Sequence, residues 1–593
     1  MTHQGTRWGQ PCRLARLRRV AARTAPLIPG IVLLLADGYG LGRLSLWRDE
    51  AYTLDAIQRP LLQIFAMARH IDAVITPYYL LMHAWIAAAG TSATALRLPS
   101  VLAMAVAAVV TTVIGRRLAS AALLPAPATT GVLAGLLFAA APQVTRYAQD
   151  ARPYGLVTTC AAIATWLLLR ALADGRWRWW AGYAVAIAAT GLFNVLALLL
   201  LAAHGTTVWF AHTGQRTASP AAIAPAGPGR GDPADGETGP QFRVLPSRWL
   251  TAAGAAIVVL TPLLVAGYWQ RSQISWLTRP RLGAVGYLVV SFGGSRLLAP
   301  LVALLVAGGM TAGLVGGRRV PVDMATVAAP WLVLPPLVLF AVSQIHPVFN
   351  FRYVVYCLPA LALLAAAGLA AVTRMATLAP LGKAAWLPAV LIVVLLLALV
   401  LEPQRLVRLP SARPDNLRRV AAIVAAYGRP GDAVLYVPSN RRAYSLAYPA
   451  PFRRLRDVAL AKSPVAAANL IGTQVPPSIL RSRFTTVARV WVIGQRSSRL
   501  LRRPVNRLEQ AEVALLNPSA WSGAGARARK CSACTAAPGR GRRRHARDHG
   551  ERDGTVLIHD GVPAHRAEVD GDRHCAGRCC RGLEPECVPG GSG

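Results

Sequence analysis

The chain has 593 residues, of which 54% are hydrophobic and 15% are charged, and its mean hydropathy is +0.40. Soluble globular proteins carry about 25% charged residues, so this composition excludes a soluble protein and indicates one that lies in a membrane. The net charge of +38 would suggest nucleic-acid binding in a soluble protein, but here the arginines fall largely in short segments between apolar runs. Such arginines set membrane orientation, so we predict no nucleic-acid partner.

The N-terminal region is basic and then apolar. The first 36 residues contain six arginines and no acidic residue, and an apolar run without a small-residue cleavage site begins at Leu27. We therefore predict that residues 1–25 are a basic cytoplasmic N-terminus, followed by an uncleaved signal anchor.

Apolar stretches recur from Leu27 to Leu401. A hydrocarbon core about 30 Å thick needs about 20 apolar residues per helix, and short loops rich in arginine and lysine favour the cytoplasm. Together these rules predict a transmembrane domain over residues 26–402 with about eleven helices. They are placed near 27–46, 96–115, 119–142, 153–173, 178–193, 195–211, 249–268, 296–316, 324–343, 352–373 and 385–402.

The stretch 74–90 is apolar but is not predicted to cross the membrane. Counting it as a span would place Arg116 and Arg117 outside, and its many aromatic and polar residues favour the headgroup region. Residues 47–95 are therefore predicted to form an external loop with interfacial helices. Residues 212–247, rich in Pro, Gly and Ala, are predicted to be a disordered cytoplasmic linker.

An odd number of spans leaves the C-terminal region outside the cytoplasm. Residues 403–518 are predicted to form a small extracytoplasmic α/β domain, with a helix over 414–427, a turn at 428–432 and strands at 433–437 and 489–493.

Residues 519–593 have almost no hydrophobic pattern and are rich in Arg, Gly and Cys, which predicts a disordered tail. The same composition arises from a shifted reading frame, so a frame-shifted tail is a second interpretation. Its cysteines are spaced too irregularly to favour a zinc site.

Two adjacent carboxylates, Asp49 and Glu50, directly follow the first predicted span. Carboxylates at the outer membrane surface are costly unless they are used or solvated. A solvated loop with an incidental acidic pair is the plain alternative.

Other polar groups converge on the same face of the membrane. External arginines run against the positive-inside bias and need a partner, for which phosphate is the natural choice. Packing or snorkelling to headgroups would explain His83 and Arg352 without a ligand. The candidate substrate-binding residues are Glu50, His70, Asp72, Tyr78, His83, Asp150, Arg152, Tyr154, Arg352 and Tyr353.

These motifs carry a family resemblance. It rests on the acidic pair, the segment from Pro77 to Trp85, Arg97-Leu98-Pro99-Ser100, Asp150-Ala151-Arg152-Pro153-Tyr154 and Arg352-Tyr353. The chain resembles the GT-C glycosyltransferases over about residues 26–402. It is most similar to the protein-mannosyltransferase-like branch (glycosyltransferase family 39-like), which includes the lipid A aminoarabinose transferases and actinobacterial mannosyltransferases.

The resemblance implies a polytopic all-α fold of GT-C type and inverting transfer of a sugar, with mannose favoured. The donor would be a polyprenyl-phosphate sugar and the acceptor an external glycan, lipid or protein. Asp49 becomes the candidate catalytic base, and Arg352, or else Arg152, the phosphate ligand. The metal ligands are unknown: Glu50, Asp72 and Asp150 would suit substrate hydroxyls or Mg or Mn. Some members of the superfamily use a divalent cation and others do not, and the sequence does not decide between them. The predicted location is the plasma membrane, with the active site on its extracytoplasmic face.

Three alternatives remain open from the sequence. One is transfer of another sugar, such as arabinofuranose. Another is a transporter or flippase of lipid-linked sugars, which the absence of a visible inverted repeat disfavours. The third is a non-catalytic scaffold of the cell envelope.

Overall fold

The structure is a computed structural model. It describes residues 23–122, 124, 126–217, 246–315, 322–378, 384, 386–487 and 489–495, and the short pieces 510–512, 514, 527–530 and 554–560. The chain divides into two compact units. One, the membrane unit, is made of residues 1–44 and 56–412. The other, the α/β unit, combines residues 45–55 with everything from 413 onward.

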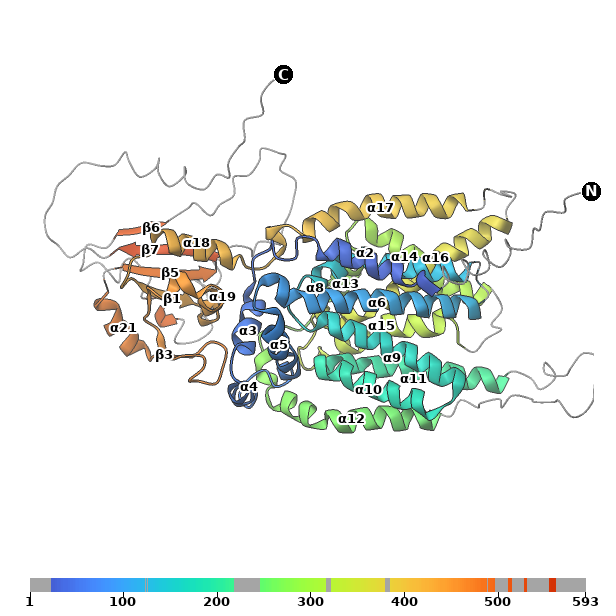
Figure 1. Ribbon diagram of the computed structural model, residues 1–593, viewed down its shortest axis with the longest axis horizontal. Helices are drawn as coiled ribbons and strands as arrows, with labels where there is room; N and C mark the ends of the chain where they lie inside the picture. The colour runs from blue at the N-terminus through green and yellow to red at the C-terminus, as the bar shows by residue number, and fades with distance from the viewer. Residues whose placement is uncertain are drawn as a thin grey trace, which may run out of the picture. The chain divides into compact units, whose positions relative to one another are not determined.

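The membrane unit is helical, and its long helices run roughly parallel to one another (Figure 1). Within the described residues, seven helical segments are long and apolar enough to cross a membrane. They are α6 (Ala93–Ala121), α9 (Tyr154–Asp174), η1 with α11 (Val195–Gly214), α12 (Pro246–Trp269), α15 (Met324–Val342), η4 with α16 (Phe351–Thr377) and α17 (Leu387–Val407).

Two bent helix pairs raise the count to nine if each pair is one span. The first joins α7 (Pro127–Ala140) to α8 (Pro142–Ala148) at 63°. Pro142 lacks the amide hydrogen that would continue the helix. The second joins α13 (Gly283–Gly293) to α14 (Leu298–Val315) at 86°, around Gly294, whose φ of +95° favours glycine.

The eleven predicted spans all coincide with helices of the structure. Nine correspond to the segments just described. The other two predicted spans coincide with α2 (Leu27–Gly38) and α10 (Trp177–Phe193), which have 12 and 17 residues and fall below the length required of a span. The chain is thus a polytopic helical membrane protein. One further helix, α13, lies between the predicted spans 249–268 and 296–316.

The predicted external loop contains three short helices. These are α3 (Arg48–Ile57), α4 (Leu61–Ala68) and α5 (Thr76–Ala89). With 14 residues, α5 is too short to be counted among the spans. This agrees with its interpretation as an interfacial helix, because a span needs about 20 residues.

Glycines allow α14 and α16 (Leu358–Leu378) to approach closely. A Cβ atom on Gly368 would overlap the carbonyl oxygen of Leu305, and one on Gly309 would overlap that of Leu364. In hydrocarbon, helices associate mainly through such close van der Waals packing, because lipid tails are as apolar as the helix surfaces and the hydrophobic effect does not favour association.

We predict that Gly368→Ala destabilises the membrane unit, by about 1–3 kcal/mol, because the added methyl group meets rigid backbone. Thermal unfolding in detergent would measure the loss. Gly254→Ala is the matched control, since a Cβ there meets nothing within 4 Å. Equal melting temperatures for the two variants would show that the α14–α16 contact is not close-packed.

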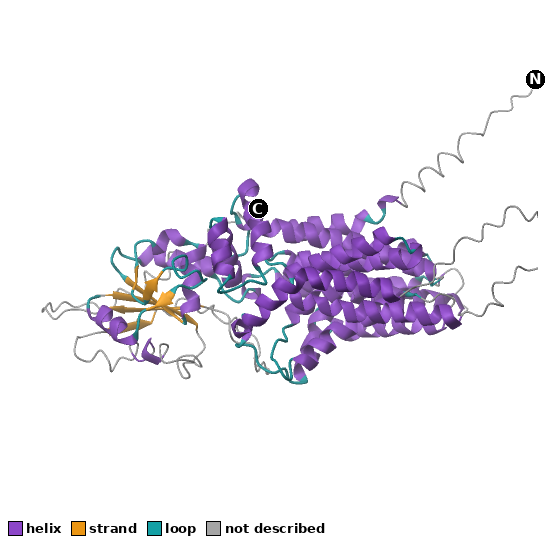
Figure 2. Ribbon diagram, turned by 90° about the horizontal axis from the view of Figure 1, so that it is seen from below, coloured by secondary structure: helices purple, strands orange, loops and turns teal. Residues whose placement is uncertain are grey.

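The α/β unit is built on a five-stranded sheet flanked by helices (Figure 2). The strand order is β2-β1-β5-β7-β6. In the centre, β1 (Ala433–Val437) pairs in parallel with β2 (Arg456–Asp457) and with β5 (Arg489–Gln495). Both strands predicted in this domain are therefore present. The helix predicted over 414–427 is α18 (Leu417–Tyr427), which begins after Asn416, whose side chain accepts the Arg419 amide hydrogen bond at 3.2 Å.

The remaining elements complete this unit. The helices α19 (Ala443–Ala447), α20 (Pro449–Phe452) and α21 (Pro477–Thr485) follow, with a two-stranded sheet of β3 (Leu460–Lys462) and β4 (Thr473–Gln474). An apolar core of buried residues such as Leu435, Val458 and Phe484 joins strands to α21.

Two strands lie within the tail that the sequence predicted to be disordered. β7 (Gly554–Asp560) pairs antiparallel with β5, and β6 (Arg527–Lys530) pairs with β7. The prediction of disorder was wrong for these pieces, because β7 contains the short apolar run 556–558 within a tail whose overall composition is polar, and its backbone pairs with β5. The two ends of the linker predicted to be disordered over 212–247 are helical, because residues 212–217 complete α11 (Leu200–Thr217) and residues 246–247 begin α12. Residues 218–245, the rest of the tail and the N-terminal 22 residues lie outside the described residues.

Candidate active site

The predicted acidic pair lies in the first turn of α3. Glu50 is fully buried, and its carboxylate accepts the backbone N–H of Trp47 at 3.3 Å. An acid at the third helical position that accepts the N-cap amide is half of a capping box. Glu50 thus has a structural task, whereas Asp49 is only partly buried. Both carboxylates also benefit from the positive end of the helix dipole.

The segment that carries the acidic pair is bound to the α/β unit. The Leu46 amide donates to the Tyr448 hydroxyl at 3.3 Å, and the Arg418 amide donates to the Ser45 hydroxyl at 2.9 Å. Further along, the Tyr52 hydroxyl donates to the Asn440 carbonyl at 2.5 Å. These bonds connect residues 45–52 to groups between 373 and 402 positions away, so a distant part of the chain holds α3.

Cations surround this helix. Burial raises the pKa of Tyr52 well above its usual value, while Arg48, Arg441 and Arg442 act in the opposite direction. Burial likewise raises the pKa of Tyr444 to about 12. Both tyrosines therefore remain protonated at neutral pH.

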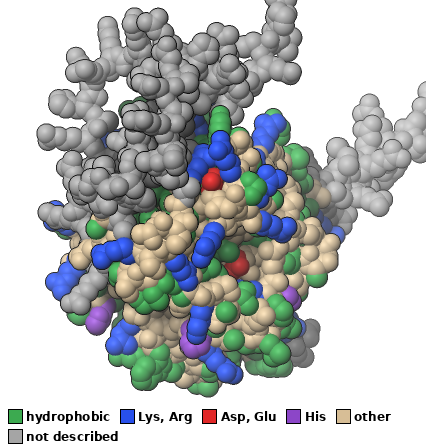
Figure 3. All heavy atoms as spheres, turned by 90° about the vertical axis from the view of Figure 1, so that its left-hand side faces the viewer, with side chains coloured by type: hydrophobic (Ala, Val, Ile, Leu, Met, Phe, Trp, Pro, Cys, Tyr) green, Lys and Arg blue, Asp and Glu red, His purple; other side chains and the backbone are tan. Residues whose placement is uncertain are grey.

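The neighbouring cation Arg441 is paired with an acid. It forms an ion pair with Asp415 at 2.5 Å, and each side chain is 5% exposed. Arg442 pairs in turn with Asp457 at 2.7 Å. Removing one member of a buried ion pair leaves the other charge buried without a partner, which destabilises the fold. These two pairs therefore hold the short helix η7 (Ser439–Arg442), whose Asn440 carbonyl accepts the Tyr52 hydrogen bond. Basic side chains are also spread over the face drawn in Figure 3, where few acidic ones are visible.

We predict that Tyr52→Phe loosens α3. Loss of one hydrogen bond worth about 1 kcal/mol corresponds to roughly a fivefold rise in local opening. Hydrogen exchange of the α3 amides measures this, and Tyr427→Phe, at a residue that is 44% exposed on α18, is the control. Unchanged exchange in α3 would mean that the Tyr52 bond does not hold the helix.

A second polar cluster lies in the membrane unit around Asp72. The Tyr79 hydroxyl donates to the Asp72 carboxylate at 2.8 Å, and Arg152 interacts with the same hydroxyl. Burial is the main cause that raises the pKa of Tyr79 well above its usual value, and Asp72 adds to it. Tyr79 is therefore a permanent hydrogen-bond donor. The structure brings two predicted residues, Asp72 and Arg152, to one buried tyrosine.

The backbone at Asp72 is strained and is held from outside. Its φ is +59°, a left-handed conformation that is uncommon for residues other than glycine. The Asp72 amide donates to Gln273 at 3.2 Å, and the next amide, of Ala73, donates to Gln270 at 2.9 Å. Gln270 also donates to the Ala68 carbonyl at 2.7 Å. Two glutamines that follow α12 thus hold the turn.

Asp150 and Arg152 lie in the loop between α8 and α9. The Ser100 hydroxyl on α6 bonds with the carbonyls of Asp150 at 2.7 Å and of Arg152 at 3.3 Å. Arg97, fully buried three residues earlier, donates to the carbonyls of Leu41 at 2.8 Å and Leu44 at 3.1 Å. The Arg-Leu-Pro-Ser motif therefore ties the end of the first helix and this loop to α6.

Arg352 and Tyr353 lie in η4 (Phe351–Cys357), which leads into α16. The helix is capped by the Asn350 side chain, which accepts the Arg352 amide at 3.3 Å. The Arg352 guanidinium lies 5.8 Å from the ring centres of Trp276 and Tyr353. Aromatic faces favour a cation at this distance and orient it.

The remaining four predicted residues differ in their surroundings. His83 makes a 2.7 Å hydrogen bond with the Ile57 carbonyl, and Tyr154 packs edge-on against Tyr147 at 5.1 Å. Tyr78 is buried, whereas His70 is exposed. The substrate-binding roles of these four residues stay predictions.

Sequence reasoning missed Tyr52, Tyr79, Gln270 and Gln273. Tyr79 lies within the segment from Pro77 to Trp85 on which the family resemblance rests. A Tyr-Tyr pair one or two helical turns after Asp72 is a signal that could have identified it. The two glutamines had no signal, because their partners lie about 200 positions earlier in the chain.

The described residues contain no group of three or more His, Cys, Asp or Glu side chains placed to hold a metal ion. The acids suggested for Mg or Mn thus do not form a site from protein side chains alone.

We predict that Tyr79→Phe destabilises the membrane unit by about 1–3 kcal/mol, because Asp72 would lose a buried donor. Thermal unfolding in detergent is the measurement. Tyr39→Phe removes the same atom from a side chain that is 66% exposed and should be neutral. A neutral Tyr79→Phe would indicate that Asp72 is satisfied by other groups.

The fold and these clusters define the class: a polytopic helical membrane protein that holds acids and arginines at helix ends and short helices. Residues 76–223 match the family described as dolichyl-phosphate-mannose-protein mannosyltransferase. This segment, about a quarter of the chain, contains α5, α6 and the loop with Asp150 and Arg152. No curated protein sequence matches the chain.

Several solved structures are similar. ArnT from Cupriavidus metallidurans in the apo state is 12% identical, with a TM-score of 0.47 over 83% of this chain and 96% of that one. The same protein bound to undecaprenyl phosphate is 12% identical, with a TM-score of 0.45 over 81% of this chain and 93% of that one. The oligosaccharyltransferase of Archaeoglobus fulgidus, tethered to an acceptor peptide, is 11% identical, with a TM-score of 0.44 over 79% of this chain and 68% of that one.

Proposed function

We propose that this chain is a membrane glycosyltransferase that moves a sugar, with mannose favoured, from a polyprenyl-phosphate donor to an acceptor outside the cytoplasm. The match of residues 76–223 to a mannosyltransferase family carries the proposal. The proposed location is the plasma membrane, with the reaction on its extracytoplasmic face. A glycan, a lipid or a protein would serve as acceptor.

In the proposed reaction, the Asp49 carboxylate takes the proton of the acceptor hydroxyl as that oxygen attacks the anomeric carbon. The bond from the anomeric carbon to the phosphate oxygen breaks, and polyprenyl phosphate leaves with the electron pair. Attack opposite to the leaving group inverts the configuration. Phosphate is a weakly basic leaving group, so the second carboxylate that glycosidases use as a general acid is not required.

The developing negative charge on the phosphate needs cations. Arg352 is the first candidate, because a guanidinium offers two parallel donors and does not lose its charge. Its contacts with Trp276 and Tyr353 orient it in advance. Arg152 is the second candidate, although its proximity to Tyr79 and Asp72 gives it a task in the fold as well.

The buried state of Glu50 supports Asp49 as the base. Glu50 already accepts a backbone amide within its own helix, whereas Asp49 is partly accessible. A base must reach the acceptor hydroxyl within about 3 Å. Of the two adjacent acids, Asp49 is the one with the required access.

The test is transfer of labelled mannose from polyprenyl-phosphomannose in membranes that contain the full chain. We predict that Asp49→Asn lowers transfer by about 10²–10⁴-fold, as expected for loss of a general base. Asp55→Asn, which makes the same change on the same helix, should stay within about twofold. Abundance of each variant is matched by immunoblotting.

The outcomes separate the parts of the proposal. Equal transfer by wild type and Asp49→Asn would rule out Asp49 as the base. Transfer from a polyprenyl-phospho-arabinofuranose donor but not from the mannose donor would change the sugar and keep the mechanism. Absence of transfer from both donors, with bound donor translocated across vesicles instead, would replace the transferase by a flippase.

A further inference from the structure

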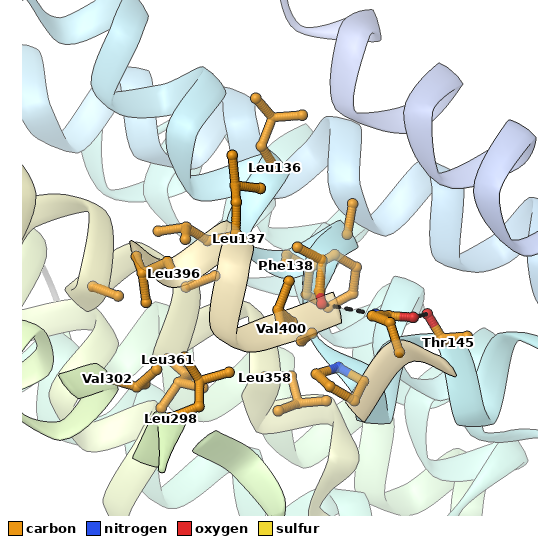
Figure 4. A pocket seen from close by; sticks show the side chains of 18 of the residues that line it. Leu136, Leu137, Phe138, Thr145, Leu298, Val302, Leu358, Leu361, Leu396 and Val400 are labelled. Atoms are coloured by element: carbon orange, nitrogen blue, oxygen red, sulfur yellow. Dashed lines mark hydrogen bonds between the residues drawn. The ribbon is translucent and has the colours of Figure 1, made fainter. Parts of the chain in front are cut away.

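A cavity of about 440 Å³ lies inside the membrane unit between α2, α7, α8, α14, α16 and α17. Its walls are almost entirely leucine, valine, alanine and phenylalanine side chains, among them Leu137, Leu361 and Val400 (Figure 4). The volume falls within the range of about 300–1,000 Å³ that is typical of ligand pockets.

One end of the cavity is polar. Thr145, Gln404 and Arg408 line it there. Gln404 bridges two segments, since it accepts from the Thr145 hydroxyl at 3.1 Å and donates to the Ala140 carbonyl at 2.8 Å. The cavity is therefore apolar along most of its length and polar at one end, as a site for an amphiphilic molecule would be.

The polar end is also where α17 is attached to the rest of the unit. Arg408 forms an ion pair with Asp37 at 2.9 Å and donates to the Ala36 carbonyl at 3.1 Å. Its side chain is 28% exposed, while that of Asp37 is 1% exposed. Arg405, one turn earlier, is exposed, as is Glu402. Of these charged residues, Arg408 lines the cavity, while Arg405 and Glu402 are exposed on the same helix.

The apolar part of α17 packs only partly against the neighbouring helices. Leu396 belongs to an apolar cluster with Leu298, Leu305 and Leu369 of those helices, and Val393 and Val400 pack against this cluster. Of the seven long spans in the described part of the chain, α17 is the least buried. The cavity runs beside this part of α17, from Val393 to Arg408.

Water is a poor occupant for this space. Cavities lined by leucine and phenylalanine stay dry, because a water molecule there lacks hydrogen-bond partners. An empty cavity would forfeit the contacts that its walls could make. In a helix bundle surrounded by hydrocarbon, the available filling is a lipid chain.

We propose that this cavity holds one acyl chain of an anionic bilayer phospholipid, with its phosphate near Arg405 and Arg408. The lining residues on α17 run from Val393 to Arg408, roughly 22 Å of helix, and the apolar walls along this length suit a single hydrocarbon chain. Basic residues at a membrane surface attract anionic headgroups. The proposal does not depend on the proposed transferase function.

The test uses the full chain, purified from membranes in mild detergent. Bound lipids are extracted and quantified by mass spectrometry for wild type, Val400→Trp and Val400→Leu. Tryptophan should fill the cavity and lower retained phospholipid at least fivefold, while leucine should lower it less. Leu391→Trp is the control, because Leu391 is on the same helix, is 59% exposed and does not line the cavity.

A second arm identifies the headgroup. The delipidated protein is titrated with phosphatidylglycerol or phosphatidylcholine, and the melting temperature is followed. A rise with phosphatidylglycerol alone, lost in Val400→Trp but kept in Leu391→Trp, supports the proposal. Equal effects of both lipids would overturn the anionic headgroup.

Three further outcomes would overturn the acyl-chain site itself. They are a wild-type protein that retains no phospholipid, retention that is the same in Val400→Trp, and retention of polyprenyl phosphate in place of phospholipid. A folded Val400→Trp protein, shown by an unchanged gel-filtration profile, is required for the comparison, and Val400→Leu supplies the same comparison if tryptophan is not tolerated.

Discussion

The hydrocarbon core of the membrane is the constraint on which the rest of this structure depends. No water is available there, so every backbone amide and carbonyl must find its partner within the chain, and helices meet that requirement locally. Helices in hydrocarbon gain little by hiding apolar surface, so they associate where small residues allow contact. The Gly309 and Gly368 contacts between α14 and α16 follow from this rule.

The same constraint places polar groups at helix ends and in short helices. Asp72, Arg152 and Tyr79 satisfy one another around a strained turn, and two glutamines from beyond α12 complete it. Arg97 and Ser100 bind carbonyls of two other segments. A transferase that handles a phosphate at the membrane surface would need such a rigid polar layer, because misplaced donors lose most of their catalytic value.

The acidic helix shows how a local motif depends on a distant unit. Asp49 and Glu50 follow the first helix in the sequence, yet their segment belongs to the α/β unit, to which Ser45, Leu46 and Tyr52 are bonded. The α/β unit is therefore part of the support of the candidate base. Within it, the Arg441–Asp415 ion pair stabilises the short helix that receives Tyr52.

Much of the fold could be predicted from the sequence, because its determinants are local. A run of about 20 apolar residues must cross hydrocarbon as a helix, and the strand over 433–437 and the helix that ends at Tyr427 are marked by their own pattern and turn residues. That the acidic pair follows the first helix could likewise be predicted from the sequence, because that apolar run ends before Asp49. The tertiary structure decided what holds that pair, which glutamines hold Asp72, how α7 and α13 bend and where α17 leaves a cavity. These features depend on contacts between residues up to 402 positions apart, which no local pattern of side chains encodes.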